Sequence, residues 1–174
     1  VSCSMFISKG RTVFLGDTSI YERPTADQLA QIAISVSKQA KLMGHTPRVA
    51  LLSFSNFGNP SGPSTDHIVQ AIKKLDSMDV DFEYDGEMSA EVALNYDLQK
   101  QRYPFCRLTG PANILIMPGL HSANISFKLM QQLGGGSVIG PMLMGSQHPF
   151  QIVQMGAQVN DIVNAAAMAV YETL

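Results

Sequence analysis

Two short runs of consecutive apolar residues constrain the fold of this chain more than any other feature. They lie within residues 48–53 (RVALLS) and 113–118 (NILIMP). A strand that is apolar at every position is typical of a strand covered on both faces, as in a parallel sheet between two layers of helices. Helical patterns alternate with these runs along the chain. The sequence therefore predicts an α/β protein, a three-layer sandwich with a mostly parallel sheet.

Local signals place the other elements of this fold. Thr25 and Gln28 are spaced as a capping box at the start of a helix, and Gly44 is expected to end that helix. Ser64 or Thr65 is expected to cap a second helix. The remaining expected elements are strands at residues 12–15, 80–84 and 137–140, and helices at residues 91–100 (weak), 122–133 and 159–172.

Composition excludes several classes of protein. The chain has 174 residues, with 12 Lys and Arg against 14 Asp and Glu, so its net charge of -2 is not that of a general nucleic-acid binder. No segment approaches the roughly 18 apolar residues of a membrane span, and the first residues do not resemble a signal peptide. Cys3 and Cys106 form no metal or redox motif, and two reduced cysteines fit a cytoplasmic location.

Charged residues make up only 15% of the chain, below the roughly 25% of an average soluble domain. The hydrophobic fraction of 45% supplies an ample core. Low charge with ordinary hydrophobicity indicates that part of the surface is covered by another subunit, another domain or a ligand.

Candidate ligand contacts follow the strands, because open α/β sheets bind ligands beyond the carboxyl ends of their strands. The first such segment holds Ser53, Ser55 and Asn56, whose side chains and neighbouring N–H groups are suited to a phosphate or carbonyl oxygen. Serines also cap loops and helices, and on spacing alone that structural role is the simpler interpretation.

A second segment begins at Pro118 and leads into a helix that carries Asn124 and Lys128 one turn apart. The start of a helix favours an anion, although an exposed helix face without function explains the same two residues. A third segment adds Gly140, Pro141 and Gly145 to the candidate ligand contacts. His121 and His148 do not have metal-ligand spacing, so no metal site is expected.

Read together, these segments resemble a known family. The chain contains, in order, RVALLSFSNFG (48–58), DGEM (85–88), LTGPANILIMP (108–118), SAN (122–124), IGPMLMG (139–145) and DIVN (161–164). This series is similar to the C-terminal half of the phosphate acetyltransferase (phosphotransacetylase) family. It is more similar still to the phosphotransacetylase-like domain at the C-terminus of bacterial hybrid NADP-dependent malic enzymes. The resemblance extends from about Thr12 to the end of the chain.

The resemblance implies a two-lobed fold of which this chain is a part. Residues 1–140 would form the second lobe, and residues 141–174 would return toward a first lobe that precedes Val1. The malic catalytic part, with NADP and Mg or Mn, would lie further upstream. The resemblance also implies a homodimer through this lobe.

The resemblance further implies a site that departs from that of active acetyltransferases. Asp161 matches the aspartate that takes the thiol proton of coenzyme A in the family. Gln154 and Met155 stand where the family has a Ser–Arg pair, and Gln132 replaces a family arginine. Glutamine and methionine cannot supply the charge or the bidentate geometry of arginine. We therefore expect a domain that binds acetyl-CoA and regulates a malic enzyme without transferring acetyl groups.

Two other hypotheses remain at the level of the sequence. The chain could be an active phosphate acetyltransferase, or a structural module for oligomerisation. Acetyl transfer would distinguish an active acetyltransferase from a regulatory domain. Binding of coenzyme A would distinguish these two from a structural module. No nucleic acid or membrane is expected as a partner.

Overall fold

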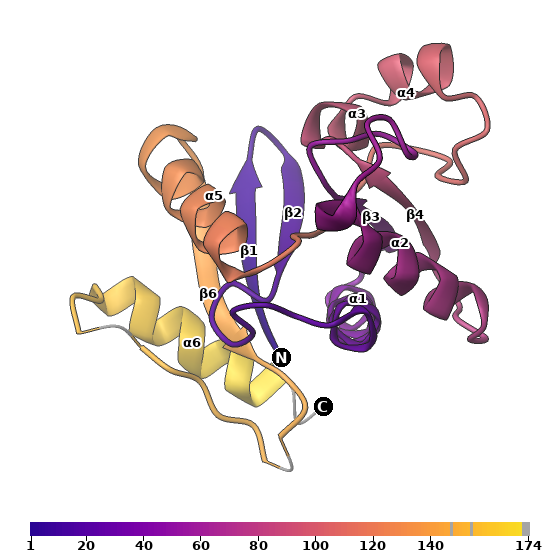
Figure 1. Ribbon diagram of the computed structural model, residues 1–174. Coiled ribbons are helices and arrows are strands. Elements are labelled where there is room, and N and C mark those ends of the chain that lie inside the picture. The colour runs from indigo at the N-terminus through magenta and orange to yellow at the C-terminus, as the bar shows by residue number, and fades with distance from the viewer. Residues whose placement is uncertain (147, 154, 172–174) are drawn as a thin grey trace.

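The computed structural model describes residues 1–146, 148–153 and 155–171, and they form one six-stranded sheet with helices on both faces (Figure 1). The sheet order is β4-β3-β5-β2-β1-β6. The strands are β1 (Ser2–Ser8), β2 (Arg11–Gly16), β3 (Arg48–Leu52), β4 (Glu83–Met88), β5 (Ile114–Ile116) and β6 (Ser137–Leu143). β4, β3, β5 and β2 run parallel, and β1 is antiparallel to both of its neighbours, β2 and β6. The predicted mostly parallel sheet is thus confirmed.

Helices complete the three layers. They are α1 (Ala26–Leu42), α2 (Pro63–Asp76), α3 (Ala90–Leu94), α4 (Tyr96–Arg102), α5 (Leu120–Leu133) and α6 (Val159–Tyr171). One apolar cluster joins β3 and β5 to α1 and α2, through residues such as Val49 and Leu51. A second cluster on the opposite face joins Ala50 and Leu52 to α3 and to the start of α5. The residues of β3 that follow Arg48 are buried on both faces, as their unbroken apolar run predicts.

The start of α1 follows the predicted capping box. Gln28 N–H donates to Thr25 Oγ1 at 3.3 Å, and Thr25 N–H donates to Gln28 Oε1 at 2.8 Å. The helix ends at Leu42, and Gly44 adopts a φ of +80°, the left-handed conformation that glycine reaches most easily.

The predicted serine or threonine cap of α2 is wrong. Gly62 is the N-cap residue, and Pro63 occupies the first turn. Proline is favoured there because its missing N–H would have no helical partner anyway. The Thr65 hydroxyl donates back to the carbonyl of Gly62 at 2.9 Å.

The strand predicted at residues 80–84 begins later and extends further, as β4 (Glu83–Met88). Val80 lies in the turn after α2, where its N–H donates to the carbonyl of Met78. Glu83 is the first residue to pair with β3. The second half of β4 carries polar residues, so its apolar pattern is weak, and long-range hydrogen bonds described below hold those residues in the sheet.

β1 is a strand that the sequence analysis did not predict. Ser2 and Ser4 are fully buried although they are polar. The Ser2 hydroxyl donates to Asp17 at 2.9 Å, and the Ser4 hydroxyl lies 2.8 Å from that of Thr18. These bonds satisfy polar groups that would otherwise be costly to bury.

No helix within the described residues is long and apolar enough to cross a membrane. The expected boundary between residues 140 and 141 falls inside β6, which continues to Leu143 and pairs with β1 on either side of a register shift at these two residues. α6 follows β6 in the chain and packs against it (Figure 1).

Candidate functional site

The carboxyl ends of the parallel strands gather several of the predicted ligand contacts at one edge of the sheet. β3 ends directly before Ser53 and β2 directly before Asp17, and β5 ends at Ile116, two residues before Pro118. Because these three strands are neighbours in the sheet, the loops that follow them lie side by side. Asn124 on α5 belongs to this group, since its Nδ2 donates to the carbonyl of Thr18 at 3.4 Å.

The loop after β3 is held by a buried glutamate at the end of β4. Glu87 Oε1 accepts hydrogen bonds from the Ser55 hydroxyl at 2.7 Å and from Gly58 N–H at 2.6 Å. The Glu87 carbonyl accepts from Phe57 N–H at 2.7 Å. Glu87 is 2% exposed and Ser55 is fully buried. Glu87 is absent from the predicted ligand contacts, although it lies in the DGEM segment (85–88) that contributes to the family resemblance.

Asn56 and Ser53 complete the loop. The Asn56 Oδ1 atom accepts from Ser89 N–H at 2.8 Å, which joins the loop to the start of α3. Ser53 Oγ accepts from Ser55 N–H at 3.3 Å, and Ser53 is half-buried. The structure therefore brings the three predicted residues Ser53, Ser55 and Asn56 together, and gives each a structural hydrogen bond.

Asp17 is a second acidic residue at this edge that the sequence analysis missed. It is 4% exposed and has a φ of +49°. Its carboxylate accepts from Ser2 N–H at 3.1 Å, from the Ser2 hydroxyl and from Tyr21 N–H at 2.7 Å. Its position directly after a strand could have indicated a turn here, because aspartate tolerates the left-handed conformation better than most residues.

Pro118 lies just before α5, and Lys128 lies in the second half of that helix. The Pro118 carbonyl is 3.2 Å from Nε2 of His67 on α2. Lys128 is exposed, and its ammonium group lies 5.4 Å from the centroid of the Phe127 ring. Asn124 and Lys128 are thus one turn apart on α5, as the sequence predicts, and both face solvent at least in part.

A pocket of about 180 Å³ lies beyond β6, between α5 and α6. Gly140, Pro141 and Asp161 line it, so the structure brings these three predicted residues together. Asp161 Oδ2 accepts from Gln158 N–H at 2.8 Å and thereby caps the start of α6. Gly145 lies after β6 with a φ of +85°.

The described residues that line this pocket include no lysine or arginine, and Asp161 is their only charged side chain. Met155 is fully exposed and Gln132 is exposed on α5. Gln154 lies outside the described residues. Within the described chain, no cluster of His, Cys, Asp or Glu is suited to a metal ion.

The predicted contacts therefore form two groups rather than one. β6 is four strands away from β3 in the sheet, and four spacings of about 4.8 Å place their ends about 19 Å apart. Only an elongated ligand, or a rearrangement of the chain, would connect the loop after β3 with the pocket beside β6.

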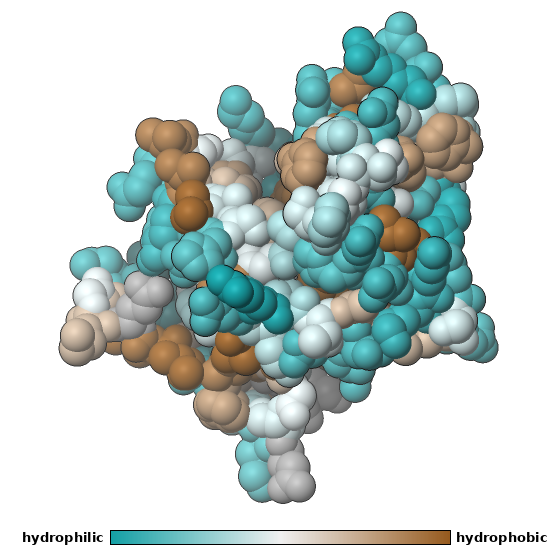
Figure 2. All heavy atoms as spheres, in the orientation of Figure 1, coloured by the Kyte–Doolittle hydropathy of each residue, from teal (hydrophilic) through white to brown (hydrophobic). Residues whose placement is uncertain are grey.

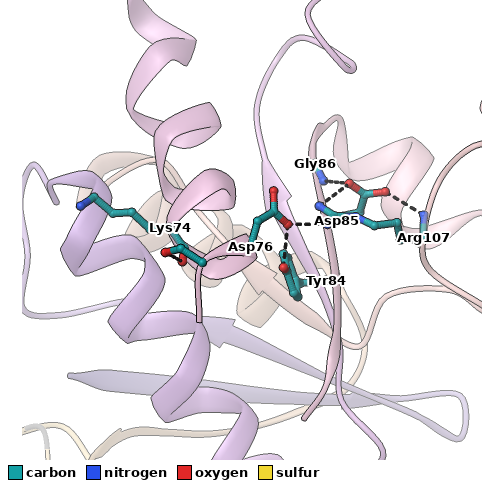
Figure 3. A network of polar contacts seen from close by, with 7 residues as sticks. Lys74, Asp76, Tyr84, Asp85, Gly86 and Arg107 are labelled. Carbon is teal, nitrogen blue, oxygen red and sulfur yellow. Dashed lines mark hydrogen bonds and ion pairs between the residues drawn. The ribbon is translucent and has the colours of Figure 1, made fainter. Parts of the chain in front are cut away.

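A polar network on the outer side of β4 was also missed by the sequence analysis (Figure 3). Arg107 donates to Asp76 at 2.6 Å and to Asp85 at 3.2 Å, and its guanidinium lies 4.6 Å from the centroid of the Tyr84 ring. Hydrogen bonds from Arg107 and from the Tyr84 hydroxyl hold the pKa of the Asp76 carboxyl below its ordinary value. Residues 76 and 107 are too distant in sequence for a local pattern to reveal them.

Backbone groups extend this network along the edge of the sheet. Arg107 N–H donates to Asp85 at 2.7 Å, and Thr109 N–H donates to Glu83 at 2.9 Å. Two acidic side chains of β4 thus bind the backbone of the segment that follows α4. Burial raises the pKa of the adjacent Cys106 thiol to about 11, so this cysteine is not an activated nucleophile.

Solved structures define the class of fold. The EutD phosphotransacetylase from Staphylococcus aureus superposes with a TM-score of 0.91 and 27% identity, over 99% of this chain and 54% of that one. A phosphotransacetylase from Streptococcus pyogenes gives a TM-score of 0.92 and 28% identity, over 98% and 53%. The fold is thus that of a phosphotransacetylase, of which the chain spans about half.

Sequence comparison defines the family. The family described as Phosphate acetyl/butaryl transferase matches residues 1–170, and the chain belongs to it. An NADP-dependent malic enzyme from Rhizobium meliloti is 50% identical over 171 residues, which is 98% of this chain and 22% of that relative. A phosphate acetyltransferase from Corynebacterium glutamicum is 32% identical over 167 residues, 96% of this chain and 51% of that relative. The resemblance described from the sequence is confirmed at this level.

Proposed function

We propose that this chain is the C-terminal part of an NADP-dependent malic enzyme, that it binds acetyl-CoA as a regulatory ligand, and that it does not transfer acetyl groups. The observation that carries the proposal is the pocket beside β6, where Asp161 is the only charged side chain among the described lining residues. The 50% identity to a malic enzyme supports the choice of parent protein.

The chemistry of acetyl transfer explains why this pocket matters. Transfer between phosphate and coenzyme A requires a phosphate group to be held in line while negative charge develops on oxygen. Asp161 adds negative charge to the pocket and has no cation beside it among the lining residues. Loss of one group that stabilises developing charge costs about 2.7–4 kcal/mol of barrier, or 10²- to 10³-fold in rate.

Binding of acetyl-CoA does not require that chemistry. The ligand is elongated, and the ends of β3 and β6, beside which the two groups of predicted contacts lie, are about 19 Å apart across the sheet. Regulation further requires that acetyl-CoA bind two states of the whole protein with different affinity. In this proposal NADP and Mg or Mn belong to the malic catalytic domain of the same polypeptide, and no residue of this chain holds them.

The test uses the full-length protein in two assays. Calorimetry with acetyl-CoA measures binding, and formation of acetyl phosphate measures transfer. We expect saturable binding, inhibition of malate oxidation by acetyl-CoA, and no acetyl phosphate above background. Absence of binding would contradict the regulatory function.

Turnover would favour the second candidate, an active phosphate acetyltransferase, provided that it depends on Asp161. Asp161→Asn is the diagnostic variant, and Asp79→Asn, at an exposed position after α2, is the matched control. Acetyl phosphate formed by the wild type and by Asp79→Asn but lost in Asp161→Asn would overturn the proposal.

We further propose that the chain self-associates through its apolar surface. Figure 2 shows hydrophobic residues gathered over α6 and the segment that leads to it, with another group over α5. Ile125, Leu129 and Leu133 recur every four residues on α5 and are 56%, 54% and 81% exposed. A two-fold interface is the commonest way to cover such a surface. Sedimentation that shows only monomer at about 50 μM, well above the Kd of a standard-sized interface, would contradict this.

A further inference from the structure

The loop after β3 depends on Glu87 for its conformation. This carboxylate is buried, yet none of the ion pairs among the described residues involves it. Burial of an ionised carboxylate is costly unless hydrogen bonds compensate it. Its donors are Ser55 and Gly58, both from the loop, at 2.7 and 2.6 Å. The buried carboxyl group is therefore stabilised by the loop, and the loop is fixed by the carboxyl group.

Hydrogen bonding within the loop leaves few donors for a ligand. The Ser55 hydroxyl gives its proton to Glu87, so it cannot also donate to a ligand. The N–H groups of Asn56 and Asn59 donate to each other's carbonyl oxygens at 3.1 Å, and Phe57 N–H donates to Glu87. Residues 55–59 of the loop therefore cannot act as a cradle of free N–H groups.

Two adjacent donors remain at the carboxyl end of β3. Ser53 Oγ accepts from Ser55 N–H, which leaves the Ser53 hydroxyl proton free to donate outward. The backbone N–H of Phe54 has no hydrogen-bond partner within the described part of the chain. Ser53 is half-buried and Phe54 is exposed, so both are accessible from outside.

We propose that Glu87 is a positioning residue for acyl-CoA: through Ser55 and Gly58 it fixes the loop so that the Ser53 hydroxyl and the Phe54 N–H receive one oxygen of the ligand. This inference rests on the proposed binding of acetyl-CoA. Ser55 then acts within the loop and not on the ligand. The receiving oxygen is a phosphoryl or a carbonyl oxygen, since both accept hydrogen bonds from these donors.

The test is a double-mutant cycle on the full-length protein, with the Kd for acetyl-CoA measured by calorimetry. The variants are Glu87→Gln, Ser53→Ala and their combination, with Glu91→Gln at an exposed position of α3 as the matched control. We expect Ser53→Ala to raise Kd about tenfold, or about 1.4 kcal/mol. Glu87→Gln should raise Kd by a similar factor. The double variant should bind acetyl-CoA no more weakly than Ser53→Ala alone.

Thermal unfolding separates positioning from a structural effect. If Glu87→Gln acted only by destabilising the fold, it would lower Tm by the same amount with serine or alanine at position 53. It would then also weaken binding by the same factor in both cases. The proposal would be overturned if the Kd of the double variant rose by the product of the two single-variant factors. It would also be overturned if Glu87→Gln left Kd unchanged. If Glu87→Gln does not fold, Ser55→Ala takes its place in the cycle with the same expected pattern.

Two probes identify the oxygen. Adenosine 3′-phosphate 5′-diphosphate carries all three phosphates of coenzyme A, and S-acetylpantetheine carries the carbonyls. If Ser53→Ala binds either probe more weakly than the wild type does, the proposal is supported and the oxygen is assigned. If Ser53→Ala binds both probes as tightly as the wild type does, the proposal is contradicted. A wild-type protein that does not bind acetyl-CoA would overturn the proposed function itself, together with this inference.

Discussion

Replacement of Arg107 by glutamine tests how much the network beside β4 contributes to stability. The substitution removes the ion pairs to Asp76 and Asp85 and the guanidinium over Tyr84 (Figure 3). It leaves the Asp85 carboxylate, whose side chain is 8% exposed, with the backbone N–H donors of residues 86 and 107 and the Cys106 thiol.

The magnitude follows from the exposure of each partner. Asp76 is 45% exposed, so its pair with Arg107 contributes at most about 1 kcal/mol. The bond to the buried Asp85 contributes about 1.5 kcal/mol, the lower end for a charged group, because other donors remain. With a small cation–π contribution at a half-exposed site, the expected loss is about 2–3 kcal/mol. For a chain of this size, that lowers Tm by about 4–12 °C.

Urea unfolding and thermal melts at pH 7, followed by circular dichroism, measure this loss. Arg102→Gln is the matched control, because Arg102 is exposed at the end of α4 and takes part in none of the ion pairs found among the described residues. A loss in Arg107→Gln within about 0.5 kcal/mol of the control, the range of ordinary surface substitutions, would refute the assigned role of the network.

Three further predictions test other parts of the structure. Gly16→Ala should destabilise the fold by about 1–3 kcal/mol in urea unfolding, because the added Cβ would lie 2.7 and 2.9 Å from two isoleucine side chains; unchanged stability would contradict this packing. At pH 8, alkylation of Cys106 should be slower than that of a free thiol, since its pKa of about 11 leaves little thiolate. The buried Cys3 should react only after unfolding, and rapid labelling of both cysteines in the native protein would contradict their burial. Because the pKa of Asp76 is lowered in the folded state, its contribution to stability should be present above about pH 4 and be lost as pH falls further, so Asp76→Asn should weaken the acid dependence of urea unfolding.

The sequence predicts those elements whose signals are local. The apolar run of β3 indicates burial on both faces without knowledge of its neighbours, and Thr25 and Gln28 determine the start of α1 within four residues. The helix starting near Pro63 was predicted, but the choice of cap was not, because serine, threonine and proline signals overlap there.

Elements that depend on distant partners could not be predicted in this way. Ser2 and Ser4 are polar, and only their bonds to residues 17 and 18 show why they lie inside a strand. The candidate site has the same difficulty. The order of the strands places β6 four positions from β3, and no spacing in the sequence specifies that order. Glu87 is likewise recognisable only once its bonds to Ser55 and Gly58 are known.

The acidic side chains of β4 also affect how this protein behaves at high concentration. β4 is an outermost strand of the sheet, and an exposed edge of this kind can pair with a strand of another molecule and start aggregation. Glu83 and Asp85 accept the N–H groups of Thr109 and Arg107, so a segment of the same chain lies along that edge. An incoming strand would have to displace this segment and bring its own carbonyl groups close to two carboxylates. These bonds therefore close the fold on this side, and we expect them to hinder intermolecular strand pairing there.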